Sequence, residues 1–136
     1  MKNVVVGLLP RKTPLDSMEY LFISATRDFG ENTGLLYPPG GHVEKNEKLE
    51  DALVREIQEE LGVTVEIEKK VTESLGDVPN QLTHWYLLKD LPYNTKFKVD
   101  KREIDALMWL TKDEIISQPE LFWNATKNFL FDFFEV

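Results

Sequence analysis

Three glutamates lie close together in a stretch of sequence whose apolar residues repeat with helical spacing. Glu56, Glu59 and Glu60 fall within the segment Glu47–Leu61, and at about 100° per residue their side chains would share about 100° of arc on a helix. The neighbouring arc is apolar and carries Leu49, Leu53, Ile57 and Leu61. Carboxylates this close repel one another unless a cation compensates. The spacing therefore predicts a site for a hard divalent cation, Mg²⁺ or Mn²⁺, beside a helix face buried in the core.

Residues next to these glutamates suit the same chemistry. Arg55 can offset part of the negative charge and orient a neighbouring carboxylate. Gly40 and Gly41 allow the backbone to approach closely, so a main-chain carbonyl or amide could face a metal ion or a phosphate. The plain alternative for such a helix is an acidic face that only meets water.

The spacing of the whole segment resembles the Nudix box, the signature of the Nudix hydrolase superfamily. That pattern is a glycine, five residues, a glutamate, seven residues, and then Arg-Glu-apolar-any-Glu-Glu-any-Gly-apolar. Its specified positions are filled here by Gly41, Glu47, Arg55, Glu56, Ile57, Glu59, Glu60, Gly62 and Val63. Many members carry a small hydroxylated residue where this chain has Lys48, so Asn46 becomes the candidate cap of the helix.

The resemblance implies an enzyme that hydrolyses a phosphoanhydride bond in a nucleoside diphosphate linked to another group. By that resemblance the metal ligands are the carboxylates of Glu56, Glu59 and Glu60 and the carbonyl of Gly40. Glu47 and Arg55 would act beside them, holding the loop and orienting a ligand glutamate. Metal ions are needed because the attacked pyrophosphate and the water-derived nucleophile are both anionic.

The general base is open between a residue of the box and Glu103. Glu103 precedes the apolar stretch Ile104–Trp109, where related chains often carry a functional carboxylate. It fits equally well as an ordinary surface residue beside Lys101 and Arg102.

Substrate recognition must come from residues outside the box. An aromatic ring could stack on a base while an amide reads its edge, although aromatics at strand or helix spacing usually belong to the core. The candidates are Trp85, Tyr86, Phe122, Trp123 and Asn124. Asn124 is similar in position to an asparagine of Nudix enzymes of the 8-oxo-dGTP type, and Pro79 to a proline of ADP-ribose-cleaving members. His42 and His84 lack a recognisable ligand or triad partner, which favours structural or exposed roles.

The elements around this segment predict an α/β (α+β) fold with a mixed β-sheet and helices on both faces, and the resemblance implies that it is a Nudix-type α/β/α sandwich. Gly62 is a helix stop, and the chain end Pro119–Phe134 is expected to be an amphipathic helix. The predicted strands are Val4–Leu9, Tyr20–Ala25, Val63–Val71, Leu82–Leu88 and Ile104–Leu110.

Composition limits the classes of function. The 136 residues fit a single domain, 1–136, and the absence of cysteine excludes disulfides and thiolate sites. A net charge of −8 argues against binding long nucleic acid. No stretch is long enough to span a bilayer, and the short apolar run after Met1 is a first strand rather than a signal peptide. We therefore expect a cytoplasmic enzyme with a small nucleotide substrate.

Several alternatives are open at this point. The leading hypothesis is hydrolysis of a nucleoside triphosphate, modified or not, to the monophosphate and pyrophosphate; dinucleoside polyphosphates and ADP-ribose or nucleotide sugars are the alternative substrates. A non-catalytic Nudix-like sensor is less favoured, because such domains typically lose box carboxylates and none is missing here. An acidic interaction module is a third possibility. The aromatic end Phe129–Phe134 could serve either the core or a homodimer contact.

Overall fold

Two β-sheets form the middle layer of the molecule, in a computed structural model that describes residues 1–136. The four-stranded sheet has the order β4 (Gly40–His42), β1 (Lys2–Leu8), β6 (Gln81–Leu88) and β5 (Ile67–Leu75). The three-stranded sheet has the order β2 (Pro10–Lys12), β3 (Met18–Ala25) and β7 (Ile104–Thr111). β1 and β6 are parallel, whereas the other pairs are antiparallel. The expected mixed arrangement of strands is confirmed.

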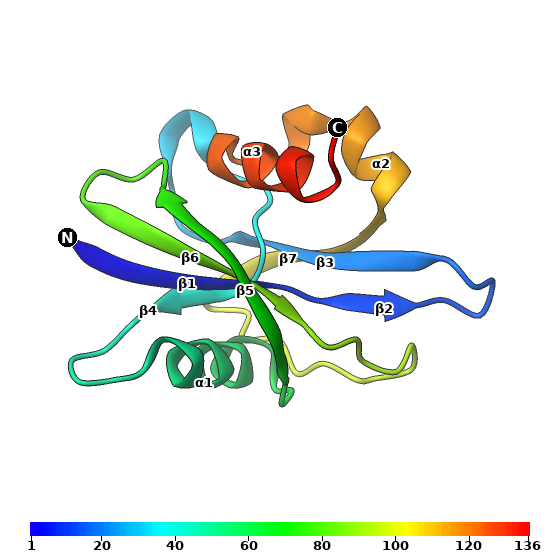
Figure 1. Cartoon of the computed structure of the whole chain (residues 1–136), viewed down its shortest axis with the longest axis horizontal. Coiled ribbons are helices and arrows are strands. Elements are labelled where there is room, and N and C mark those ends of the chain that lie inside the picture. Colours follow the sequence, from blue (N-terminus) through cyan, green and yellow to red (C-terminus); the bar gives the residue numbers. More distant parts are fainter.

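Helices cover both sides of this layer. Figure 1 shows α1 (Leu49–Leu61) on one side and α2 (Lys112–Ser117) with α3 (Asn124–Phe133) on the other. Two short 3-10 turns, η1 (Gly30–Asn32) and η2 (Pro119–Leu121), complete the elements. The predicted α/β/α sandwich is thus confirmed. No helix combines the length and the apolar character that crossing a membrane requires.

The core has one part on each side of the strands. Leu53, Ile57 and Leu61 of the predicted apolar face of α1 are fully buried against strand residues such as Val5 and Tyr86, whereas Leu49 is half-buried at the edge of the same cluster. Burial of a leucine or isoleucine side chain contributes about 1.5–3 kcal/mol, so these three contacts anchor α1. Because the apolar face is held inward, the adjacent acidic face is held at a fixed edge of the sheet.

The two ends of α1 differ in how well the sequence predicted them. Gly62 ends the helix in the left-handed region, with φ 68° and an N–H donated to the Gln58 carbonyl at 3.0 Å, as expected. The prediction that Asn46 caps the start was wrong. Lys48 occupies the cap position without a capping hydrogen bond, and Asn46 adopts a φ of 64° in the preceding turn.

Other boundaries moved for reasons of tertiary packing. β5 begins at Ile67 rather than Val63, because Val63 and Val65 are buried in the core as a connection. The predicted helix Pro119–Phe134 is divided into η2 and α3. The interruption arises where the Trp123 N–H donates to the Leu36 carbonyl at 3.2 Å. The short elements β2, β4 and α2 were not predicted.

Candidate functional site

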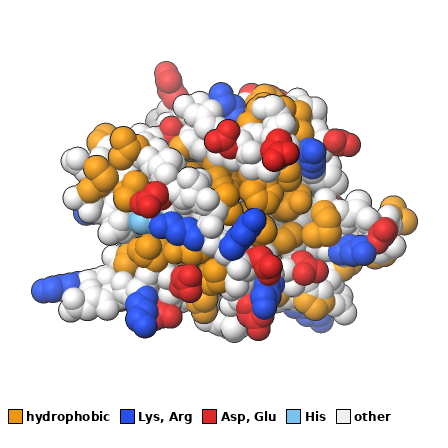
Figure 2. Space-filling model, in the orientation of Figure 1, with side chains coloured by type: hydrophobic (Ala, Val, Ile, Leu, Met, Phe, Trp, Pro, Cys, Tyr) orange, Lys and Arg blue, Asp and Glu red, His pale blue; other side chains and the backbone are white.

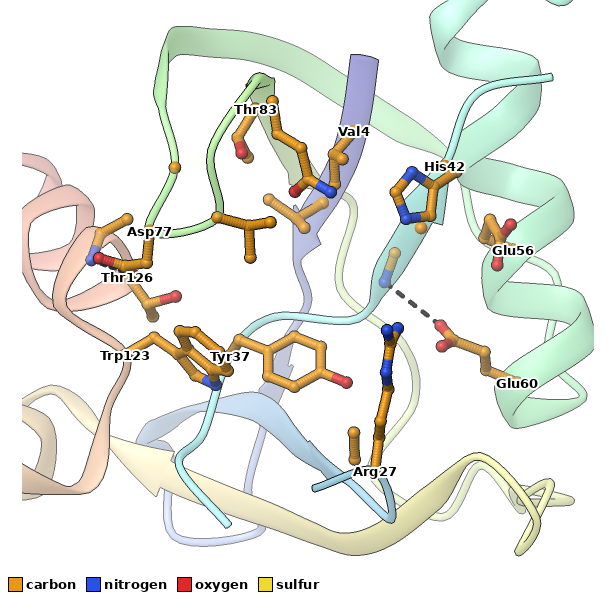
Figure 3. Close-up of a pocket in the computed structure, with 18 of the residues that line it drawn as sticks. Val4, Arg27, Tyr37, His42, Glu56, Glu60, Asp77, Thr83, Trp123 and Thr126 are labelled. Atoms are coloured by element: carbon orange, nitrogen blue, oxygen red, sulfur yellow. Dashed lines mark hydrogen bonds between the residues drawn. The ribbon is translucent and has the colours of Figure 1, made fainter. Parts of the chain in front are cut away.

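A cavity of about 720 Å³ lies between the acidic face of α1 and the start of α3. Figure 3 shows Glu56 and Glu60 on one side of it and Trp123, Thr126 and Asp77 on the other. The two sides differ in chemistry, because one presents carboxylates and the other presents aromatic and hydroxyl groups. The fold therefore joins an acidic end and an aromatic end in one space.

The paired glycines allow the acidic end to form. A Cβ at Gly41 would overlap the Glu56 carboxylate, and a Cβ at Gly40 would overlap the carbonyl of Val5 on β1. Only glycine lets β4 approach both β1 and α1 this closely. The Gly40 N–H then donates to Oε1 of Glu60 at 3.3 Å, which ties the strand to the helix.

Arg55 joins the box loop to the helix. Its Nε and Nη2 donate to the two carboxylate oxygens of Glu47 at 2.8 and 2.9 Å, and Nη2 also donates to the His42 carbonyl at 3.1 Å. Its Nη1 donates to Glu56 at 3.0 Å and to Glu59 at 3.3 Å. These charge-assisted bonds lower the pKa of Glu47 to about 2. Arg55 thus connects Glu47 to Glu56 and Glu59, and the supporting role of Glu47 and Arg55 stays a prediction.

Glu60 is the carboxylate least compensated by the protein. Burial, followed by the nearby charge of Glu56, raises its pKa to about 8, although the Gly40 N–H acts in the opposite direction. Burial also raises the pKa of Glu56, where Arg55 opposes the shift. Two partly buried carboxylates with raised pKa values would be compensated by a cation at this end of the cavity.

The donor chemistry fits a hard divalent cation. Every side-chain donor on the acidic face of α1 is a carboxylate oxygen, which is the ligand type that Mg²⁺ and Mn²⁺ prefer. As the side chains stand, no three acidic or histidine residues are gathered in a metal-binding arrangement. Glu59 is 58% exposed and turned towards Arg55. Metal ligation by these residues is accordingly a proposal.

Glu103 shares the cavity with the box glutamates. It is exposed at the start of β7 and lines the same space. Burial and the charges of Glu60 and Glu103 raise the pKa of the Tyr37 hydroxyl to about 12, which shows that both carboxylates act on one group. The structure therefore brings Glu103 to the acidic end, as its candidacy as a base requires.

Arg27 is a cavity residue that the sequence did not reveal. Figure 3 shows its guanidinium extending into the cavity beside Tyr37 and Glu60. It forms no ion pair, and its guanidinium carbon lies 5.2 Å from the centre of the Phe29 ring. A single basic residue in a polar loop carries no distinguishing local pattern, so only the fold could place it here.

The predicted substrate-contacting residues separate into two groups. Trp123 lines the cavity and lies edge-on to Phe29 at 5.1 Å between ring centres. Trp85 borders the same cavity, but it is 3% exposed and its ring packs in the core against Phe129. Tyr86 and Phe122 are core residues, 3% and 4% exposed, that do not line the cavity. Asn124 is exposed at the start of α3 and also lies outside the lining. Adjacent strand residues point to opposite faces, so Trp85 and Tyr86 could not both face the cavity.

The two histidines occupy different environments. His42 is exposed at the cavity rim on β4. His84 is buried on the α1 side of the sheet, where its ring nitrogens lie 2.9 Å from Asn3 Oδ1 and 2.9 Å from Lys70 Nζ. Burial lowers the pKa of His84. Its contacts agree with the structural role expected from the sequence.

Comparison with known proteins provides an independent observation. The family model for the NUDIX domain matches residues 5–133. The NAD-capped RNA hydrolase NUDT12 of Homo sapiens is 35% identical over 86 residues, which are 59% of this chain and 18% of that protein. The CTP pyrophosphohydrolase of Escherichia coli (strain K12) is 27% identical over 89 residues, 65% of this chain and 64% of that protein. The chain thus spans about a fifth of the length of NUDT12.

Solved structures show the same fold at low sequence identity. The C. elegans Ap4A hydrolase in a binary complex superimposes with a TM-score of 0.76 at 18% identity, covering 98% of this chain and 95% of that one. The MutT protein from Methanosarcina mazei Go1 gives a TM-score of 0.75 at 20% identity, covering 98% and 92%. At these identities the likeness establishes the architecture alone.

Proposed function

Because the chain belongs to the NUDIX domain family, we propose that it is a metal-dependent nucleotide pyrophosphohydrolase. The substrate class proposed is a nucleoside triphosphate, modified or not, cleaved to the monophosphate and pyrophosphate. One observation carries this proposal: the carboxylates Glu56 and Glu60, with raised pKa values, face a cavity whose opposite end is aromatic. That division suits a substrate with a phosphate chain and a nucleoside.

The proposal assigns the metal site to the end of the cavity formed by α1 and β4. The residues proposed to hold Mg²⁺ or Mn²⁺ are Glu56, Glu59, Glu60 and the Gly40 carbonyl. The bound ion would neutralise phosphate charge and lower the pKa of water. Glu47 and Arg55 keep the loop and the ligand glutamates in place through the bonds between them.

Two further residues take roles in the proposed reaction. Arg27 donates to the phosphate chain, since its guanidinium faces the cavity without an ion-pair partner. Glu103 accepts the proton of the attacking water. As the new P–O bond forms, the bond to the pyrophosphate oxygen breaks, and that oxygen leaves with the electron pair.

Charge distribution supports a small substrate over a long polyanion. Figure 2 shows acidic and basic side chains intermixed over one face of the molecule, and the net charge is −8. A long nucleic acid is bound mainly by lysines and arginines that neutralise its phosphates. A small nucleotide delivered with divalent cations fits this surface better, and a cytoplasmic location goes with it as a prediction.

The substrates named for the similar proteins differ from one another. Those proteins include an NAD-capped RNA hydrolase, a CTP pyrophosphohydrolase and an Ap4A hydrolase, and all of these names describe phosphoanhydride-containing nucleotides. The Ap4A hydrolase keeps dinucleoside polyphosphates as an alternative substrate class, and ADP-ribose or nucleotide sugars are the alternative kept from the sequence. Product analysis over a panel of these nucleotides with Mg²⁺ or Mn²⁺ identifies the bond that is broken.

The decisive test compares the wild-type protein with a Glu60→Gln variant. The variant keeps the size of the side chain but removes the charge, so we expect turnover to fall at least about 100-fold. Mg²⁺ should also raise the Tm of the wild-type protein and leave that of the variant nearly unchanged. Normal turnover in Glu60→Gln would contradict the ligand assignment, and tight nucleotide binding without any product would favour a non-catalytic sensor.

A further inference from the structure

The N-terminus of α3 is capped by a residue from a distant loop. The residue before the helix is Trp123, which makes no capping hydrogen bond. Instead, Oδ2 of Asp77 accepts a hydrogen bond from the Ala125 N–H at 2.9 Å, across 48 residues of sequence. A carboxylate here satisfies a free N–H and meets the positive end of the helix dipole. The bond therefore joins the β5–β6 loop to the helical layer.

Both segments joined by this bond line the aromatic end of the cavity. The loop contributes Asp77 and Val78, and the start of α3 contributes Trp123 and Thr126. Figure 3 shows Asp77, Thr126 and Trp123 together on the side opposite α1. The Asp77 bond thus connects two halves of a single wall.

The rest of the wall is already held in place. The loop is fixed at its base, where the Lys2 N–H donates to the Asn80 carbonyl at 2.8 Å. The backbone of Trp123 is fixed by its bond to Leu36, and its ring by the edge contact with Phe29. α3 is held on the sheet by the stacking of Phe129 on Trp85, and the Asp77 bond ties the tip of the loop to the first turn of the helix.

The wall also offers polar groups to a bound molecule. Thr83 and Thr126 are 7% and 2% exposed, and both line the cavity. Neither hydroxyl has a hydrogen-bond partner within the protein, so both are available to a ligand. A cavity lined by an aromatic ring and two such hydroxyls suits a base and its ribose rather than a phosphate chain.

We infer that Asp77 is a positioning residue for the nucleoside end of the substrate. Its carboxylate holds the β5–β6 loop and the first turn of α3 together, so that Trp123 and Thr126 meet the nucleoside as one preformed wall. This inference rests on the proposed function, which places the phosphates at the acidic end. A preformed wall lowers the ordering cost of binding, so Asp77 acts on substrate affinity and not on the chemistry at phosphorus.

The test uses two substitutions of Asp77 and one matched control. Asp77→Ala removes the cap, whereas Asp77→Asn removes the charge and keeps an oxygen that accepts the Ala125 N–H. Asp132→Ala removes the same charge from an exposed position near the other end of α3. We expect Asp77→Ala to raise KM for the preferred nucleotide about three- to tenfold with kcat within about twofold, and the other two variants to match the wild type.

A second readout needs no substrate. In the nucleotide-free protein, hydrogen exchange at the Ala125 amide should be faster in Asp77→Ala than in the wild type, and close to the wild type in Asp77→Asn. A purely structural role would speed exchange or lower the Tm without moving KM. The pairing of faster exchange with a raised KM is what positioning predicts.

The outcomes separate this inference from the function on which it rests. If the wild-type protein cleaves a nucleotide but Asp77→Ala keeps its KM, or loses kcat instead, the inference is wrong and the function stands. Equal losses in Asp77→Ala and Asp77→Asn would also overturn it, because they would point to the charge. If the wild-type protein neither binds nor cleaves any nucleotide, the proposed function fails and the inference fails with it.

Discussion

At the scale of single residues, Glu60 carries a large change in pKa on folding. Its pKa is about 8 in the folded protein against an ordinary 4.5, so the folded state keeps a proton that the unfolded chain releases between these values. The stability contributed by this group is therefore complete below pH 4.5 and is lost as the pH rises through 8. In EDTA, we expect the Tm to fall by a few degrees between pH 5 and pH 8.5.

Glu60→Gln should remove that part of the pH dependence. The amide does not titrate, so the fall in Tm between pH 5 and pH 8.5 should become smaller in metal-free Glu60→Gln, measured by calorimetry. Glu120→Gln, at an exposed position of η2, is the control and should follow the wild type. An unchanged pH profile in Glu60→Gln would show that Glu60 is not the group responsible.

Arg27 allows a second prediction at this scale. If its guanidinium contacts the phosphates, Arg27→Ala should raise KM about tenfold, because a charge-assisted hydrogen bond is lost. Arg27→Lys should recover part of the loss. Lys96→Ala, on an exposed loop outside the cavity lining, removes the same charge and should leave KM unchanged. Steady-state kinetics on all three variants decides whether the position or only the net charge matters.

At the scale of elements, the contact between β4 and α1 depends on Gly41. A Cβ there would overlap the Glu56 carboxylate, so Gly41→Ala should displace that side chain and lower kcat/KM by about 100-fold or more. A double-mutant cycle tests the cause. The loss of Tm caused by Gly41→Ala should shrink in a Glu56→Ala background, and an undiminished loss would place the strain elsewhere.

α2 provides an element that is independent of the site. Thr111 and Glu114 form a complete capping box at its start. Thr111→Ala should lower the free energy of unfolding by about 1 kcal/mol while leaving kcat/KM unchanged. Denaturant unfolding measures the change in stability, and steady-state kinetics on the same sample measures kcat/KM. A marked loss of activity would show that α2 is coupled to the cavity.

At the scale of the whole molecule, the aromatic chain end closes the layer above the sheet. Phe129 is 6% exposed and stacks on Trp85 at 4.4 Å between ring centres, so it serves the core. Phe129→Ala should cost about 3–5 kcal/mol of stability, measured by denaturant unfolding. Homodimer formation stays a prediction, and the molar mass of the wild-type protein, measured by light scattering, tests it.

Local spacing explains what the sequence predicted well. A helix places residues three and four apart on one face whatever surrounds it, so the buried row of Leu53, Ile57 and Leu61 and the acidic row beside it were predictable. The helix stop at Gly62 was predictable for the same reason, since only the local backbone is involved. The capping box at Thr111 is also a local signal, and it would have revealed α2.

Contacts between distant segments were decided by the tertiary structure alone. Strand alternation places Trp85 and Tyr86 on opposite faces of the sheet, but only the packing of the layers decides that the face of Trp85 borders the cavity. Arg27 and Asp77 lie in loops without distinguishing patterns, and they reach the cavity because separate chain segments meet there. The sequence by itself thus determined the acidic face of α1 and its chemistry, because the geometry of a helix is local. The aromatic end of the cavity was decided only by the tertiary structure, because it forms where loops that are distant in sequence meet.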